Sequence, residues 1–322
     1  MQKIDEIICK IKESKNILLF THENPDGDAV GSTMALFNAL KNQFQKKVTA
    51  VCPSDIPKPF AFAKYSEEFK KDFIIGDYDL IIILDCGDLR RTGFPNRIKT
   101  NAEYSNRIVN IDHHQKNDIH KIASINHVNY DVSSTAEMVY ELLDRMNINF
   151  NRDIATALLC GLYTDTGAFK HANTSAKALE IASKLMHYGA RLNLITDNIT
   201  CGKSVSTLKL WGRVLTKIKH NKELGLIYSV ITQKDLKVCN ASQDDLAGVV
   251  NLINTIPGTN AAILLSQIEP GKIKASIRTE CNNVDVSRLA SLFGGGGLKK
   301  ASGFVIDGTF IETETGWSIE FI

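Results

Sequence analysis

The chain contains, at residues 16–32, the stretch NILLFTHENPDGDAVGS. Its first five residues form a short apolar run, which is typical of a strand buried in a sheet. The next residues supply a turn sequence, Asn24-Pro25-Asp26-Gly27, together with a histidine and several acids. From Val30 onward the apolar residues recur at helical intervals. The stretch therefore predicts a strand, a polar loop and a helix, in that order.

The same alternation of strands and helices continues to about residue 190. Residues 79–84 (DLIIIL) are the clearest strand, and their continuous apolar run indicates a strand covered on both faces. Further strands are predicted over residues 47–52 and 107–111. Helices are predicted over residues 4–14, 134–146, 153–163 and 175–188. This order predicts an α/β fold, with a largely parallel sheet and helices on both of its faces.

The second half of the chain follows a different order. Residues 191–219 have helical spacing and are interpreted as a connecting segment. After it we predict two further helices and three strands, over residues 225–231 (strand), 244–254 (helix), 261–267 and 272–278 (strands) and 286–293 (helix). Because Glu269-Pro270-Gly271 joins two successive strands, a hairpin and a smaller α+β domain are predicted. The predicted boundaries are 1–190 for a catalytic domain, 191–220 for a helical linker and 221–322 for a substrate-binding domain.

Composition limits the class of protein. At 322 residues the chain is long enough for two domains, and its net charge of +2 gives no global basic field of the kind that marks a nonspecific nucleic-acid binder. The seven cysteines are scattered, with no C-x-x-C pair, which is typical of a reducing cytoplasm. No apolar run reaches the roughly 18 residues needed to span a membrane. We therefore expect a soluble cytoplasmic protein with no membrane partner.

Three predicted strands end in residues that bind metal ions. The strand at 16–20 leads to His22, Asp26 and Asp28; the strand at 79–84 leads to Asp85; and the strand at 107–111 leads to the run 112–114, Asp-His-His. In open parallel sheets, ligands bind beyond the carboxyl ends of the strands. We therefore expect these imidazoles and carboxylates to meet at one edge of the sheet.

The chemistry of this group favours divalent cations. Histidine and aspartate without thiolate suit ions such as Mn²⁺ better than a structural zinc site. The carboxylates outnumber the needs of one ion, whereas two ions about 3.5–4 Å apart could share one aspartate and carry out phosphoryl transfer. Taken alone, Asp26 fits a turn residue, Asp85 a helix cap and the two histidines surface residues. Their joint position after three buried strands favours a metal site.

The motifs resemble those of the DHH phosphoesterase superfamily, in the same order along the chain. The matching segments are His22-x-Asn24-Pro25-Asp26-Gly27-Asp28, then Asp85, then Asp112-His113-His114, then Asp165-Thr166-Gly167. The C-terminal part resembles the companion DHHA1 domain, through Ser276-Ile277-Arg278 and Phe293-Gly294-Gly295-Gly296-Gly297. The whole chain is most similar to the oligoribonuclease and phosphoadenosine-phosphate (PAP) phosphatase group, also called nanoRNases. By itself, Asp165 at the end of a predicted helix would be an ordinary helix stop.

The resemblance implies a role for each matching residue in the first domain. His22 and Asp26 would bind one metal, Asp28, His113 and Asp165 the other, and Asp85 would bridge the two. Asp112 would orient His113. His114 would lie over the reacting phosphate and donate to its oxygens or to the leaving group.

In the second domain the resemblance implies phosphate binding by Arg278 and by the backbone of Gly294, Gly295, Gly296 and Gly297. A guanidinium binds phosphate with two parallel hydrogen bonds, and glycine lets the backbone approach closely. Leu298 departs from the pattern, because the family's glycine run is usually followed by a histidine that contacts substrate. The departure leaves the metal ligands unchanged and puts the nucleotide preference in doubt.

The implied activity is hydrolysis of short oligoribonucleotides to 5′-mononucleotides by two metal ions, most simply Mn²⁺, with PAP as a further substrate. The alternative is a phosphodiesterase for cyclic-di-AMP or its linear dinucleotide pApA, with the same metals and a different pocket. A non-catalytic nucleotide-binding regulator is a third hypothesis, against which the intact ligand set argues. The sequence does not give the oligomeric state, and a homodimer is open.

Overall fold

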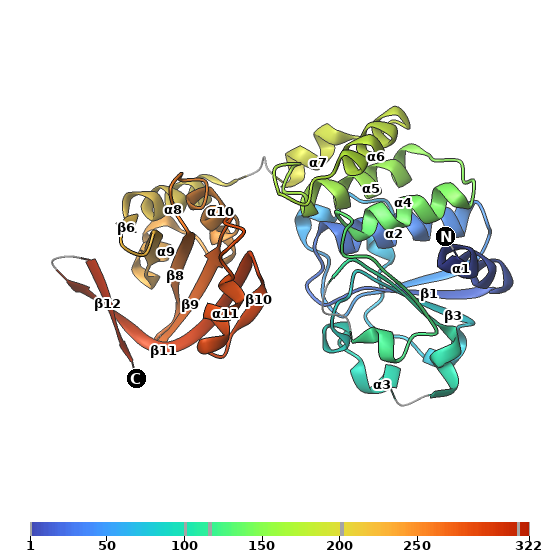
Figure 1. Ribbon diagram of the computed structural model, residues 1–322, viewed down its shortest axis with the longest axis horizontal. Coiled ribbons are helices and arrows are strands. Elements are labelled where there is room, and N and C mark those ends of the chain that lie inside the picture. The colour runs from blue at the N-terminus through green and yellow to red at the C-terminus, as the bar shows by residue number, and fades with distance from the viewer. Residues whose placement is uncertain (1, 100–101, 115–117, 200–202, 314–315, 322) are drawn as a thin grey trace. The chain divides into compact units, whose positions relative to one another are not determined.

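The computed structural model describes residues 2–99, 102–114, 118–199, 203–313 and 316–321. The chain divides into two compact units, Met1–Gly202 and Lys203–Ile322 (Figure 1). The predicted linker is divided between them. Helix α7 (Leu192–Ile199) packs on the first unit through the buried Ile195, and α8 (Val205–Thr216) packs in the second through the buried Leu210 and Val214. Each helix has its own apolar face, so neither forms a separate connecting segment.

The first unit contains a five-stranded sheet in the order β2-β1-β3-β4-β5, and each neighbouring pair is parallel. Its strands are β1 (Asn16–Phe20), β2 (Lys47–Val51), β3 (Leu80–Leu84), β4 (Ile108–Asp112) and β5 (Ile125–Val128). The chain runs from β1 outward to β2 and then returns to β3 on the other side of β1. Such a reversal opens a crevice at the carboxyl ends of β1 and β3, where open α/β sheets bind their ligands.

The long helices cover one face of this sheet (Figure 1). The other face is covered by α3 (Pro95–Lys99) and by short helical turns at residues 75–77, 89–92 and 119–121. The longer helices are α1 (Gln2–Glu13), α2 (Gly27–Asn42), α4 (Thr135–Arg145), α5 (Arg152–Asp165) and α6 (Ala176–His187). The 3₁₀ turns are η1 (Lys58–Phe60), η2 (Ser66–Glu68), η3 (Ile75–Asp77), η4 (Leu89–Thr92), η5 (Ala102–Arg107) and η6 (Ile119–Lys121). Along β1, Ile17 and Leu19 enter the core under the long helices, while Leu18 and Phe20 enter the opposite core. This confirms the predicted α/β fold with a covered parallel sheet.

The second unit is built on a mixed sheet in the order β10-β11-β9-β8-β7-β6, with β12 paired to β11. Its strands are β6 (Lys219–Asn221), β7 (Leu226–Ile231), β8 (Ala261–Glu269), β9 (Lys272–Arg278), β10 (Gly296–Leu298), β11 (Ala301–Thr313) and β12 (Gly316–Phe321). Its other helices are α9 (Gln233–Cys239), η7 (Asp244–Leu246), α10 (Val249–Ile253) and α11 (Val286–Leu292). β8 and β9 form the predicted antiparallel hairpin, which confirms the α+β class.

One predicted helix of this unit is wrong in its extent. The prediction ran without interruption over residues 244–254, whereas the structure contains η7, then Gly248, then α10. Gly248 has a φ of 88°, in the left-handed region that interrupts an α-helix. The apolar spacing continues across the break, and it therefore predicted one helix instead of two short ones.

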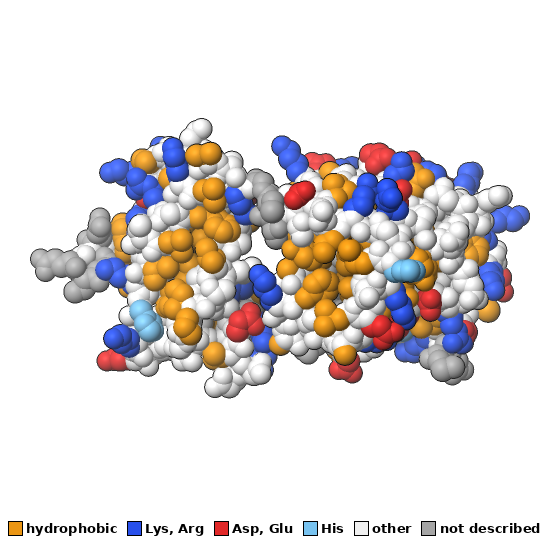
Figure 2. Space-filling view, turned by 90° about the horizontal axis from the view of Figure 1, so that it is seen from above, with side chains coloured by type: hydrophobic (Ala, Val, Ile, Leu, Met, Phe, Trp, Pro, Cys, Tyr) orange, Lys and Arg blue, Asp and Glu red, His pale blue; other side chains and the backbone are white. Residues whose placement is uncertain are grey.

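The surface carries both signs of charge. On the face drawn in Figure 2, lysine and arginine side chains lie among acidic ones. Within the described ranges, every helix is too short or too polar to cross a bilayer. The cytoplasmic location stays a prediction.

Candidate metal centre and active site

Asp26 and Asp28 are placed by the start of helix α2. Asp26 is the N-cap, and its Oδ1 accepts the backbone N–H groups of Asp28 (3.1 Å) and Ala29 (3.0 Å). Asp28 is fully buried, and its two oxygens accept the N–H groups of Thr135 (2.6 Å) and Ala136 (2.8 Å). Those two amides begin helix α4, where free N–H groups and the helix dipole stabilise negative charge. Two helix N-termini therefore hold these two carboxylates.

Asp85 lies at the centre of the group, directly after β3. Its Oδ1 accepts a hydrogen bond from the Thr135 hydroxyl (3.0 Å), and its side chain is 1% exposed. Nε2 of His22 lies 3.8 Å from one of its oxygens, and Nε2 of His113 lies 3.6 Å from the other. Asp85 adopts a φ of 55°, a left-handed conformation that is uncommon outside glycine and is found at functional sites. The backbone thus directs this carboxylate between two imidazoles.

Asp165 completes the group from the last residue of α5. Its Oδ2 lies 3.1 Å from Nε2 of His113, and that Nε2 lies 4.0 Å from Oδ2 of Asp28. Gly161 of the same helix permits this placement, because a Cβ there would lie 2.5 Å from the Asp28 carboxylate. The close approach of the two helices therefore brings Asp165 to the sheet edge.

All six predicted ligands lie together. Their donor atoms form two groups of three within which the atoms are no more than 4.8 Å apart, namely His22, Asp26, Asp85 and Asp28, His113, Asp165. A third such group contains Asp85, His113 and His114. These donors are imidazole nitrogens and carboxylate oxygens without thiolate, a set that could hold divalent cations.

The electrostatics of the group also fit bound cations. Burial, together with the charges of Asp85 and Asp165, raises the pKa of Asp28 well above its usual value. Burial and the neighbouring Asp26 raise the pKa of Asp85 to about 7. Burial lowers the pKa of His113, but the hydrogen bond with Asp165 and the charge of Asp85 outweigh it and raise that pKa to about 10. Carboxylates forced together in this way ionise fully only beside compensating positive charge, which divalent cations supply.

Asp112 differs from the prediction in its partner. We predicted that it orients His113, whereas its Oδ1 lies 2.7 Å from Nδ1 of His114 and also accepts the backbone N–H of His113 (2.9 Å). Asp112 ends β4, and in extended chain the side chains of residues i and i+2 point the same way. The carboxylate therefore meets the ring of the second histidine of the motif.

In the second unit, Arg278 and Leu298 share one face of the sheet. Arg278 of β9 pairs with Ala301 of β11, and Ala301 pairs with Leu298 of β10, so the three residues form one row across the strands. Nε of Arg278 donates to Oδ1 of Asn251 on α10 (3.1 Å), and burial lowers the pKa of its guanidinium. Among the residues that the structure describes, Arg278 has no acidic partner. Leu298, which occupies the position where the family pattern has histidine, therefore lies two strands from Arg278, the predicted phosphate-binding residue.

The four predicted phosphate-binding glycines divide into two kinds. A Cβ on Gly295 would lie 2.3 Å from the carbonyl oxygen of Gly303, and one on Gly297 would lie 2.5 Å from that of Ala301. These two glycines are therefore required by the packing of β10 and its approach against β11. A Cβ on Gly294 or Gly296 would meet open space. Phosphate binding by the run stays a prediction, and the structure leaves room for it at Gly294 and Gly296.

Comparison with known families places the chain. The model of the DHH family N-terminal domain matches residues 16–162, and that of the DHHA1 domain matches residues 225–314. The chain belongs to the DHH family. It is accordingly a hydrolase of the phosphodiesterase and phosphatase type.

Several DHH relatives align over nearly the whole chain. A bifunctional oligoribonuclease and PAP phosphatase NrnA of Thermus thermophilus is 30% identical over 91% of this chain and 84% of its own length. A protein of the same name from Mycoplasma genitalium is 28% identical over 94% of this chain and 92% of its own. The crystal structure of an exopolyphosphatase-related protein from Bacteroides fragilis superposes with a TM-score of 0.87 at 27% identity, covering 94% of this chain and 90% of that one.

Two residues at the DHH site were not predicted from the sequence. One is Thr135, whose hydroxyl donates to Asp85. The other is Arg91 on η4, whose guanidinium nitrogen lies 2.8 Å from Nδ1 of His22. Burial and Arg91 lower the pKa of His22, and Asp26 raises it, with a net lowering. Arg91 follows β3 within the same loop as Asp85, so its position at the carboxyl end of a parallel strand was the signal that could have found it.

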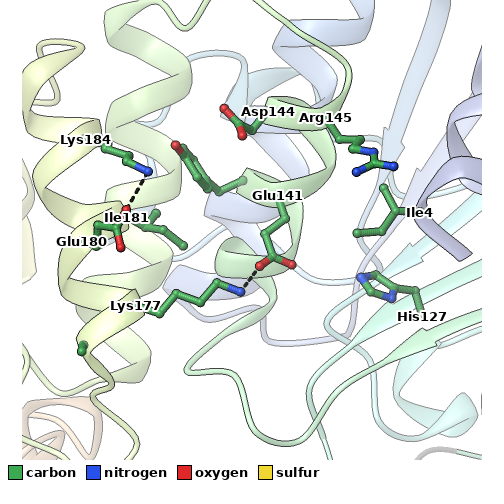
Figure 3. Close-up of a pocket in the computed structure, with 11 residues that line it drawn as sticks. Ile4, His127, Glu141, Asp144, Arg145, Lys177, Glu180, Ile181 and Lys184 are labelled. Atoms are coloured by element: carbon green, nitrogen blue, oxygen red, sulfur yellow. Dashed lines mark hydrogen bonds and ion pairs between the residues drawn. The ribbon is translucent and has the colours of Figure 1, made fainter. Parts of the chain in front are cut away.

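A cavity of about 730 Å³ lies apart from this site, lined by residues of α1, β5, α4 and α6 (Figure 3). Each of its cations has an acidic partner: Lys177 with Glu141, Lys184 with Glu180, and Arg145 with Asp5. Figure 3 marks the first two of these ion pairs with dashed lines. The lysines and the arginine that line this cavity are therefore already neutralised by acids.

Proposed function

We propose that the chain is a two-metal phosphoesterase that hydrolyses short oligoribonucleotides to 5′-mononucleotides and also converts PAP to AMP. The observation that carries the proposal is the position of Asp85 between two three-residue groups: it belongs to the group with His22 and Asp26, and its other oxygen lies 3.6 Å from Nε2 of His113 in the second group. Two adjacent cation sites that share a carboxylate suit phosphoryl transfer. The substrates follow the names of the bacterial relatives, which are oligoribonucleases and PAP phosphatases.

In this proposal His22, Asp26 and Asp85 hold one divalent ion, and Asp28, His113 and Asp165 hold the other, with Asp85 in reach of both. We propose Mn²⁺, because imidazole and carboxylate donors without thiolate suit it. When bound, the two ions polarise the phosphate and lower the pKa of a water.

His114 is proposed to protonate the leaving oxygen. Asp112 accepts the Nδ1 proton of His114 at 2.7 Å, which leaves Nε2 as the atom that faces the substrate. Burial lowers the pKa of His114, but the hydrogen bond with Asp112 and the charge of Asp85 outweigh it, so the pKa is raised. A raised pKa favours the protonated ring, which is the form a general acid requires. When the P–O bond breaks, the departing oxygen takes the Nε2 proton.

In the second unit Arg278 is proposed to bind a phosphate of the substrate, with the open backbone at Gly294 and Gly296 as further donors. Asn251 holds the guanidinium from one side, and no carboxylate among the described residues competes with a phosphate for it. Leu298 is 61% exposed on the same face and offers an apolar contact where relatives of the family usually have histidine.

The test is hydrolysis in Mn²⁺ of a ladder of RNA from two to about ten nucleotides, with PAP, pApA and cyclic-di-AMP alongside. The proposal predicts release of 5′-mononucleotides that is fastest on the shortest members and fades with length, together with turnover of PAP. Turnover confined to pApA or cyclic-di-AMP would instead assign the chain to cyclic-dinucleotide breakdown. Binding without turnover of any substrate would indicate a nucleotide-binding regulator.

A further inference from the structure

Two adjacent arginines on η4 differ in their surroundings. Arg90 is 84% exposed on its side chain and pairs with Asp88 at 2.7 Å. Arg91 is half-buried at the metal centre, and within the described part of the chain it forms no ion pair. An arginine that stands beside a group of acids without pairing to any of them retains its charge for another anion.

The backbone of Arg91 is fixed on both sides of the crevice. Its carbonyl oxygen accepts the N–H of Glu23 at 2.7 Å, which ties η4 to the loop that carries His22. Its own N–H donates to the carbonyl of Asp88 at 3.0 Å. These hydrogen bonds fix the backbone of Arg91 between the carboxyl ends of β1 and β3, so the guanidinium can move only by rotation about its side-chain bonds.

The contact between Arg91 and His22 cannot persist in the form of His22 that binds a cation. Nδ1 of His22 lies 2.7 Å from the carbonyl oxygen of Glu23 and 2.8 Å from the guanidinium of Arg91. A ring nitrogen either donates or accepts, so only one of these contacts is a hydrogen bond. If Nδ1 donates to Glu23, Nε2 carries the lone pair toward Asp26 and Asp85, as a ligand must. Arg91 then faces an N–H and has lost its acceptor.

We propose that Arg91 binds a phosphate group of the substrate at the carboxyl edge of the first unit's sheet. This inference rests on the proposed phosphoesterase function. A guanidinium offers several parallel N–H donors that match phosphate oxygens, and its charge opposes that of the phosphate. When His22 binds a cation, Arg91 has no acceptor on its ring, and the phosphate oxygens of the substrate supply one. Arg91 is therefore a catalytic residue of the first unit, in addition to the six ligands and His114.

The test compares Arg91→Ala and Arg91→Lys with Arg90→Ala as the matched control. We measure kcat/KM on pApA at saturating Mn²⁺, and the affinity for AMP and for Mn²⁺ alone by calorimetry. Arg91→Ala should lower kcat/KM by about 10- to 100-fold, the range for loss of a charged hydrogen bond. It should weaken AMP binding and leave Mn²⁺ binding unchanged. Arg91→Lys should recover part of the loss, and Arg90→Ala should remain within about twofold of wild type.

Three results would overturn the inference. The first is equal kcat/KM for the Arg91→Ala and Arg90→Ala variants. The second is a loss in Arg91→Ala that tracks weaker Mn²⁺ binding and is restored by more Mn²⁺, which would mean that Arg91 only positions His22. The third is unchanged AMP affinity in Arg91→Ala. Failure of the wild-type chain to hydrolyse any nucleotide would instead contradict the proposed function, and the AMP measurement would still decide the role of Arg91.

Discussion

The two units differ in how far some of their functional groups are buried. In the first, Asp28 and Asp85 are 0% and 1% exposed, and each shares neighbours with the other ligands. In the second, Leu298 is 61% exposed and Gly296 faces open space. Buried acids depend on one another for charge balance, whereas exposed contacts act separately. We therefore expect any single substitution among the ligands of the first unit to abolish turnover. Substitutions in the second unit should change substrate preference independently of one another.

The largest effect is expected at Asp85. The Asp85→Asn variant keeps the shape of the side chain and tolerates the φ of 55°, because asparagine adopts left-handed backbone more readily than most residues. It removes the charge that both cation sites share, so kcat should fall by at least about 1,000-fold, or roughly 4 kcal/mol. Steady-state kinetics on pApA check this. Asp88→Asn, in the same loop, is the control, and its kcat should stay near that of the wild type. Comparable losses of kcat in both variants would contradict the proposal that Asp85 is shared by the two cations.

Metal removal should destabilise the first unit alone. Both tryptophans, Trp211 and Trp317, belong to the second unit, so their fluorescence follows that unit while circular dichroism follows both. Chelation should lower the unfolding temperature that circular dichroism measures. Each cation site filled at 100 times its Kd adds about 2.7 kcal/mol to the free energy of unfolding, and chelation removes that contribution. The fluorescence transition should not move. Equal shifts in the two signals would show that the cations are not confined to the first unit.

The stabilisation by metal should also grow with pH. Because the pKa of Asp85 is raised to about 7 in the folded chain, that chain binds protons more tightly than the unfolded one. The metal-free protein therefore loses stability as pH rises from about 4 to about 7. Bound cations compensate the charge that then develops, so the Mn²⁺-dependent rise in Tm should be larger at pH 7.5 than at pH 5.5. A gain that is flat or falls with pH would contradict this.

A smaller effect is expected from the glycine run of the second unit. A Cβ on Gly295 would lie 2.3 Å from the backbone oxygen of Gly303, so Gly295→Ala forces β11 to shift. We expect a loss of about 1–3 kcal/mol in the free energy of unfolding, followed by tryptophan fluorescence in urea. Gly296→Ala is the matched variant, since its Cβ meets open space, and should change stability by less than about 0.5 kcal/mol. Similar losses in the free energy of unfolding for both variants would show that the close approach of Gly295 to the backbone of Gly303 does not explain why glycine is needed there.

The smallest effect is expected at Arg278. Arg278→Ala removes one phosphate contact that acts alone, so KM should rise about tenfold, or roughly 1.4 kcal/mol, with little change in kcat. Kinetics on pApA separate the two constants. Lys274→Ala, on the same strand and face, serves as control and should behave as wild type. A fall in kcat without a change in KM would mean that Arg278 joins the chemistry of the first unit, and the comparison between the units would break.

Strands that are buried and apolar were predictable because their side chains alone select that structure. β1 was predicted with its observed bounds, and β3 and β4 to within a residue at each end. The convergence of the residues after these strands follows from parallel topology, which is why five of the six ligands could be placed from pattern. Asp165 could not, because it arrives on a helix whose approach to Asp28 depends on packing at Gly161. Only the family resemblance indicated it.

Most features that sequence did not predict depend on contacts rather than on local pattern. β5 (Ile125–Val128) has a polar middle, Asn126 and His127, and becomes a strand by pairing with β4. β10 consists mainly of glycine and lacks the apolar run by which a strand is predicted, whereas β11 and β12 carry apolar residues at strand spacing that were left out of the prediction. The contact of Arg91 with His22 depends on side-chain direction within a loop, which periodicity does not encode.

The first unit is proposed to hold two divalent cations around Asp85. The most direct measurement is anomalous diffraction at the manganese edge from crystals grown with Mn²⁺. Two peaks about 3.5–4 Å apart are expected, one bound by His22 and Asp26, the other by Asp28, His113 and Asp165, and both by Asp85. A single peak, or two peaks that do not share Asp85, would contradict the proposal.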